Sequence, residues 1–206
     1  MMRKIYYSLA IIIIIIISAC KSGVKNKCEF SGMVNFSFLN NLVSMEVPSE
    51  LLTNKDTVNH DFEMNRRSLY VCELSTKDSS NYIFVQADSY DDYSPISKDV
   101  ENNLNRLRNV QMSIVKYDNG YLFERYDTVN GKMIGEFIFE GKQINNDVVT
   151  GGITFYHNKK RIEIVVLLKN KNFTDTRERV RCILSSVKPP NDKIIVKPGT
   201  AGLYYY

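Results

Sequence analysis

The two histidines, His60 and His157, are the side chains of this 206-residue chain best suited to general acid–base chemistry. A hydrolase triad needs a nucleophile, a base and an orienting group in contact. His60 stands in a polar loop, His157 stands in a turn, and no serine has the glycine pattern of a nucleophile elbow. The Thr-Gly-Gly-Ile stretch at 150–153 is expected to form a bend, and it is not a phosphate loop. We therefore expect no enzymatic activity and no cofactor, with both histidines at surface or turn positions.

Three aspartates, Asp88, Asp91 and Asp92, cluster before the first predicted helix. Carboxylates suit calcium, but this spacing departs from the EF-hand loop and no glutamate closes it at the required position. Helix N-termini also favour acidic side chains, because the macrodipole places partial positive charge there. We expect capping or solvated carboxylates and no metal site, with calcium kept as the weaker alternative.

Five tyrosines near strand ends or loops invite a carbohydrate-binding interpretation, since sugar sites often use aromatic platforms. They are Tyr90, Tyr93, Tyr117, Tyr121 and Tyr126. Aromatic side chains are also common on sheet faces, where they pack against cross-strand neighbours. Packing is therefore the expected role for most of them, and glycan binding stays open as an alternative.

The N-terminus is predicted to be a targeting signal. Arg3 and Lys4 precede an almost wholly apolar run at 5–17, which is shorter than the roughly 20 residues of a bilayer-spanning helix. The run ends in small residues, as a secretory signal does. Ile17-Ser18-Ala19-Cys20 resembles the lipobox of bacterial lipoproteins. The resemblance implies that residues 1–19 are a cleaved signal peptide and that Cys20 carries diacylglycerol and a further acyl chain such as palmitate. An uncleaved signal anchor is the alternative.

Lipidation would make the membrane a partner through Cys20, with residues 20–29 as a polar tether. Two or three acyl chains hold a protein firmly, whereas one chain binds only marginally. By the sorting pattern of enterobacterial lipoproteins, Lys21 favours the outer membrane of the bacterial cell envelope. No acidic cluster follows Cys20, so a periplasm-facing domain is expected.

The composition of the mature chain excludes an obvious nucleic-acid role. Loss of residues 1–19 removes Arg3 and Lys4 and leaves 25 basic against 23 acidic side chains, with no basic block. The remaining length suits one domain with one sizeable core. We place that domain at 30–188 and a C-terminal tail at 189–206.

Three cysteines remain besides Cys20, so all of them cannot pair within one chain. On the last predicted helix Cys182 lies roughly opposite the apolar face, and Cys72 shares one side of a strand with Tyr70 and Leu74, where burial is expected. Cys28 precedes the first strand in a segment that could cross the outside of the helix. A Cys28–Cys182 disulfide is the first choice, and unpaired cysteines acting as small apolar side chains are an equal alternative.

The predicted elements are short strands, a helix opened by Ser94-Pro95, an antiparallel meander, and a last helix near 173–187. Asn119-Gly120 and Asn130-Gly131 are both strong hairpin signals, because type I′ turns need positive φ at two residues. A strand is expected at 111–117, leading to the first of these turns. The strand at 161–168 is apolar at nearly every position, so it is predicted to be buried on both faces. Asp175 with Glu178 fits a capping box at the start of the last helix.

This order of elements resembles the PsbP-like superfamily, which includes the Ran-binding nucleotide-release factors. The most specific stretch is the hairpin at 153–168, the Phe173 and Asp175 entry, the helix and its closing residues 184–188. The resemblance implies an α+β fold, an α/β/α sandwich on a mainly antiparallel sheet, and a non-catalytic binding or assembly module. A specific partner does not carry over. We therefore expect a membrane-anchored lipoprotein that binds an envelope protein or supports assembly of a complex. The alternative is a small-ligand, calcium or glycan-binding lipoprotein.

Overall fold

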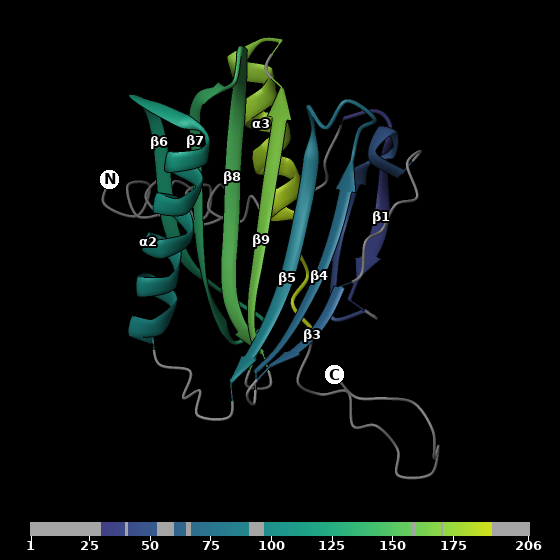
Figure 1. Cartoon of the computed structure of the whole chain (residues 1–206), viewed down its shortest axis with the longest axis vertical. Helices are drawn as coiled ribbons and strands as arrows, with labels where there is room; N and C mark the ends of the chain where they lie inside the picture. Colours follow the sequence, from purple (N-terminus) through teal and green to yellow (C-terminus); the bar gives the residue numbers. More distant parts are fainter. Residues whose placement is uncertain are drawn as a thin grey trace, which may run out of the picture.

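The computed structural model describes residues 30–39, 41–52, 60–64, 67–90, 97–157, 160–169 and 171–190 (Figure 1). The elements are β1 (Met33–Phe38), β2 (Val43–Pro48), η1 (Ser49–Leu52), β3 (His60–Met64), β4 (Arg67–Ser75), β5 (Tyr82–Tyr90), α2 (Ser97–Ile114), β6 (Lys116–Val129), β7 (Lys132–Gln143), β8 (Asn146–His157), β9 (Lys160–Lys169) and α3 (Phe173–Ser185). The predictions for Cys20, Cys28, Asp91, Asp92 and Tyr93 lie outside the described residues. No helix within these ranges has the length and apolar character needed to cross a bilayer.

A seven-stranded sheet forms the centre of the fold, in the order β3-β4-β5-β9-β8-β7-β6, and every neighbouring pair is antiparallel. β9 joins the two halves, because it pairs with β5 on one side and with β8 on the other. β1 and β2 form a separate antiparallel hairpin. The prediction of an α+β sandwich on a mainly antiparallel sheet is therefore confirmed.

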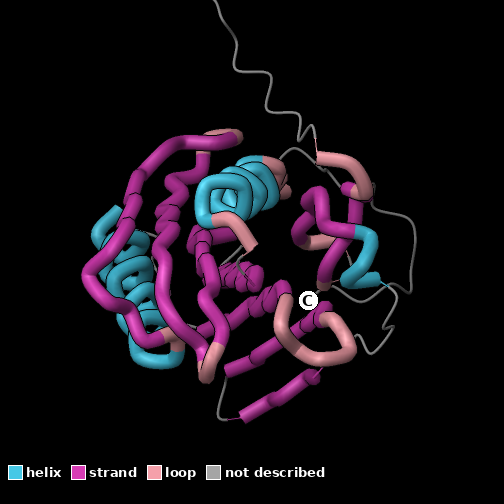
Figure 2. Tube along the Cα trace, turned by 90° about the horizontal axis from the view of Figure 1, so that it is seen from above, coloured by secondary structure: helices cyan, strands magenta, loops and turns pink. Residues whose placement is uncertain are grey.

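Two apolar cores cover the two faces of this sheet. On β9, Ile162, Ile164 and Val166 belong to the core that α3 and the β1–β2 hairpin close, whereas Val165 and Leu167 belong to the core beneath α2. Figure 2 shows α3 on the inner side of the curved sheet and α2 on its outer side. We call these the inner and outer faces. The prediction that this strand is buried on both faces is confirmed.

The first helix is longer at its C-terminal end than expected. Residues 111–114 belong to α2, so the strand predicted from residue 111 was wrong. Gln111 continues the spacing of Leu104 and Leu107 and is buried with them. A polar residue at a core position thus concealed one more helical turn from the hydrophobic pattern.

The second helix begins at a different cap from the one predicted. Asn172, not Asp175, is the N-cap of α3, and its side-chain oxygen accepts a hydrogen bond from the Thr174 amide at 3.1 Å. Asp175 lies inside the first turn, where its charge complements the helix dipole.

One of the two predicted hairpin turns forms. Asn130 and Gly131 have φ angles of 52° and 76° and connect β6 to β7, as a type I′ turn requires. Asn119-Gly120 does not form a hairpin, because β6 runs through it and resumes pairing with β7 after a register shift between Tyr117 and Leu122. The extra residues form a bulge in the edge strand.

The glycine pair at Gly151 and Gly152 lies in the middle of β8, so the predicted bend was wrong. A Cβ atom on Gly151 would stand 2.7 Å from both Val180 and Leu184 of α3, and one on Gly152 would stand 2.7 Å from the Phe137 ring. The two glycines therefore allow close approach of side chains to opposite faces of the same strand.

Gly151→Ala is expected to lower the free energy of unfolding by about 1–3 kcal/mol, because the added methyl group overpacks the contact with α3. Urea unfolding measures the loss. In a Val180→Ala background one of the two clashing branches is absent, so the same substitution should cost less. An equal cost in both backgrounds would contradict this account.

Candidate functional site

A buried ionic network lies on the outer face of the sheet. Asp88 of β5 is fully buried, and its Oδ2 atom lies 2.6 Å from a guanidinium nitrogen of Arg161 on β9. Nε of Arg161 also lies 3.1 Å from Glu163, which is 2 % exposed. Charges at this depth require partners, because desolvation of an isolated ion is costly.

The same network attaches α2 to the sheet. Arg106 of α2 forms an ion pair with Glu163, and Asn103 accepts a hydrogen bond from Arg161 at 3.0 Å and donates one to Tyr156. Gln86 of β5 donates a further hydrogen bond to Glu163 at 2.9 Å. These directional contacts fix the position of α2 over the sheet, while its apolar stripe supplies the buried area.

The network gives Asp88 a structural role. Its carboxylate pairs with Arg161 beneath α2, and no group of three or more His, Cys, Asp or Glu side chains among the described residues is arranged to hold a metal ion. With Asp91 and Asp92 outside these residues, calcium binding by the three-residue cluster stays an untested alternative.

Arg161→Met is expected to lower the free energy of unfolding by about 3–5 kcal/mol, because Asp88 and Glu163 would stay buried without their shared cation. Arg106→Met should cost far less, since the Arg106 side chain is 46 % exposed and Glu163 would keep Arg161. Urea unfolding at neutral pH compares the two. Equally small losses would show that the buried network contributes little to stability.

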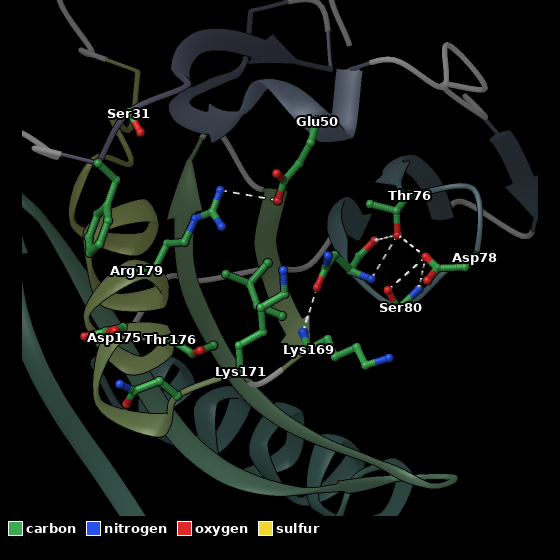
Figure 3. A pocket seen from close by; sticks show the side chains of 14 residues that line it. Ser31, Glu50, Thr76, Asp78, Ser80, Lys169, Lys171, Asp175, Thr176 and Arg179 are labelled. Carbon is green, nitrogen blue, oxygen red and sulfur yellow. Dashed lines mark hydrogen bonds and ion pairs between the residues drawn. The ribbon is translucent and has the colours of Figure 1, made fainter.

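A polar cleft of about 830 Å³ opens on the other side of the molecule, where α3 begins (Figure 3). Its walls come from α3, η1, the end of β9 and the turn between β4 and β5. The lining residues are Phe30, Ser31, Glu50, Thr76, Asp78, Ser80, Asn81, Leu168, Lys169, Lys171, Asn172, Asp175, Thr176 and Arg179.

Charges of both signs line this cleft. Figure 3 shows Arg179 of α3 directed toward Glu50 of η1, and the two side chains form an ion pair at 3.3 Å. Two lysines and two aspartates add two further charges of each sign. Such a surface can make directional contacts with a ligand that carries both positive and negative groups.

The turn between β4 and β5 forms a stable edge of the cleft. Asp78 accepts hydrogen bonds from the Thr76 hydroxyl at 2.7 Å and from the amide and hydroxyl groups of Ser80 at 3.1 and 2.8 Å. These bonds, that of Thr76 first, lower the pKa of Asp78 to about 2. Asn81 ties the turn to β9, since its side-chain oxygen accepts from the Lys169 amide at 2.6 Å.

The described tyrosines named for glycan binding have different surroundings. Tyr117 packs edge-on against Phe139, and Arg177 lies 4.5 Å from the centroid of the Tyr121 ring. Tyr126 lies on β6, and its side chain is 46 % exposed. The side chain of Tyr90 lies outside the described residues.

The two histidines lie on different strands. His157 is the last residue of β8, where the turn was expected, and its side chain is buried, not at the surface. His60 begins β3, and its side chain lies outside the described residues.

Cys182 is disulfide-bonded, whereas Cys72 is free and buried beside Leu74, as the strand pattern predicted. Burial raises the pKa of the Cys72 thiol, and the nearby Glu73 carboxylate adds to this effect. The described residues do not include the partner of Cys182, so its pairing with Cys28 stays a prediction.

Two acidic residues that form buried polar contacts are not among the site residues predicted from the sequence. Glu136 and Glu163 stand inside otherwise apolar strands, and each is 2 % exposed. The available signal was a carboxylate in the middle of a strand that is otherwise built for a core, since buried charges need partners.

Fold and site together define an α+β sandwich with an ionic network beneath one helix and a polar cleft beside the other. Two solved structures are similar to the chain. The Saccharomyces cerevisiae Ran-binding protein Mog1p shares 12 % identity with a TM-score of 0.39, covering 77 % of this chain and 96 % of its own. PsbP (CyanoP) from Synechocystis sp. PCC 6803 shares 9 % identity with a TM-score of 0.43, covering 82 % of this chain and 96 % of its own.

No protein-family model and no curated protein matches the chain. With TM-scores below 0.5, neither solved structure supports an argument about what this chain binds. The architecture of this chain is defined by its strand order and its two helical layers.

Proposed function

We propose that this chain is a lipid-anchored, non-catalytic binding module whose polar cleft receives a segment of a cell-envelope protein. The observation that carries the proposal is the cleft of about 830 Å³ at the start of α3, with its paired and unlike charges. The resemblance of residues 17–20 to a lipobox supports the anchor.

The polarity of the cleft favours a protein segment over a small apolar ligand. Small-molecule sites are lined mainly by apolar and aromatic side chains with a few polar groups. Here Phe30 and Leu168 are the apolar members of a mostly polar and charged lining. Protein surfaces of this kind bind partners through complementary charges, which also set specificity.

The position of the cleft suits a partner at the membrane. Phe30, which lines the cleft, directly follows the predicted tether at 20–29. Ten residues reach at most about 35 Å when fully extended. A lipid on Cys20 would therefore hold the cleft within reach of membrane proteins and of the outer membrane surface that faces the periplasm.

Cys20→Ala is expected to abolish incorporation of labelled palmitate into the chain, because the thiol is the proposed site of lipid attachment. Cys28→Ala, which changes a cysteine eight positions away, should keep the label. Metabolic labelling followed by membrane fractionation measures both. An unlabelled wild-type chain that stays integral to the membrane would instead establish an uncleaved signal anchor.

Lys171→Glu is expected to reduce recovery of the bound envelope protein about ten-fold or more. The new carboxylate would repel the acidic group of the partner that the Lys171 ammonium attracts. Lys142→Glu makes the same charge change at an exposed position on β7 and should leave recovery unchanged. The measurement is co-purification from detergent-solubilised envelope, with thermal melts to show that both variants fold.

The same experiment can contradict the proposal. Recovery of one stoichiometric protein that is insensitive to Lys171→Glu would move the interface away from the cleft. Thermal stabilisation by calcium or a sugar, with no co-purified protein, would favour the ligand-binding alternative.

A further inference from the structure

A second, smaller pocket lies at the opposite end of α3 from the cleft. It has a volume of about 140 Å³ and is formed on the inner face by β6, β7, β8 and the end of the helix. Its lining residues are Arg125, Asp127, Val129, Ile134, Glu136, Ile153, Leu184, Ser185 and Val187.

Glu136 is the buried charged group of this pocket. Its side chain is 2 % exposed, and its Oε2 atom accepts a hydrogen bond from Nε of Arg125 at 2.6 Å across the β6–β7 ladder. Its Oε1 atom is also buried and accepts no hydrogen bond from the described residues. A buried acceptor without a donor is costly, so this oxygen favours a ligand that brings an N–H group.

The surroundings of Glu136 favour a positively charged donor. Asp127 adds a second carboxylate to the pocket wall. Leu184 and Ser185 belong to the end of α3, where the macrodipole is negative, and the last turn of this helix has no basic side chain. The nearby Arg181 is already engaged, since it pairs with Glu178 at 2.6 Å.

The remaining walls are apolar and suit a short alkyl chain. They come from Val129, Ile134, Ile153, Leu184 and Val187. A volume near 140 Å³ equals about four to five water molecules, at about 30 Å³ for each. A chain of about four carbons fits this space, with its end group at the carboxylates.

We propose that this pocket binds a primary alkylammonium group, supplied by a lysine side chain of a protein partner or by a free polyamine. The alkyl stem contacts the apolar walls, and the ammonium donates to Oε1 of Glu136 and lies near Asp127. The pocket is separate from the polar cleft, so this inference does not rest on the proposed function.

The protonation of Glu136 links binding to pH. Burial raises the pKa of this carboxyl, an effect that Asp127 reinforces and that Arg125 and Arg181 oppose. Below the raised pKa the carboxyl is neutral, and above it the carboxylate that attracts a cation is formed. Affinity for an ammonium ion therefore increases as the pH rises through this pKa. A bound ammonium ion in turn lowers the pKa of Glu136, because it stabilises the carboxylate.

The test is a titration of the folded chain with n-butylammonium chloride, followed by methyl NMR. We expect shifts at the methyl groups of Val129, Ile134, Ile153, Leu184 and Val187. Binding of n-butanol should be at least about ten-fold weaker, because its hydroxyl can donate a hydrogen bond to Glu136 but carries no positive charge to pair with the carboxylates. Glu136→Gln should weaken butylammonium binding to a similar degree. Glu101→Gln, the same change at an exposed position of α2 on the outer face, should leave it unchanged.

Three outcomes would overturn the proposal. They are no shift at the pocket methyl groups, equal binding of n-butanol, and full binding by a Glu136→Gln variant whose thermal melt shows that it is folded. The source of the ammonium is separated by two further titrations. Binding of N-acetyl-lysine-methylamide at the same methyl groups indicates a partner's lysine, and binding of spermidine alone indicates a free polyamine.

Discussion

The burial of β9 on both faces is the constraint on which this fold depends. The strand pairs with β5 and β8, so it joins the two halves of the sheet, and its side chains alternate between the two apolar cores. Neither face can be left to water, because each carries large aliphatic side chains whose exposure would cost about 25 cal/mol for each Å² of apolar area. The α2 helix on the outer face and α3 with the β1–β2 hairpin on the inner face meet this requirement.

The two helices cover their faces in different ways. α2 lies over a face that contains charges, and its position is fixed by ion pairs and hydrogen bonds to Glu163, Tyr156 and Arg161. α3 packs through Val180, Ile183 and Leu184, and Gly151 leaves room for Val180 and Leu184. At 13 residues α3 spans about 20 Å, whereas the 12 residues of β8 span about 40 Å. The helix is therefore too short to cover the strands, and the cleft and the small pocket lie at its two ends.

The sequence predicted an element correctly where neighbouring residues alone decide its conformation. The Asn130-Gly131 turn needs only two positive φ angles, and the buried strand at 161–168 needs only an unbroken apolar run. Predictions failed where a distant residue decides the outcome. Asn119-Gly120 has the same dipeptide chemistry, but pairing with β7 on both sides of it keeps β6 continuous. Gly151 lies within a strand and not in a bend. A glycine is needed there because side chains of α3, some 30 positions later, occupy the space that a Cβ atom would take.

The sequence by itself determined the apolar periods and the turn between β6 and β7, since each is a property of neighbouring residues. Only the tertiary structure decided which charges meet. Asp88 and Arg161 are 73 positions apart and form a buried pair because β5 and β9 are hydrogen-bonded neighbours. Glu136 faces Arg125 across the β6–β7 hairpin, but it lies in a pocket because the end of α3 approaches this hairpin. Strand order and helix placement bring such groups together, and no local pattern encodes that order.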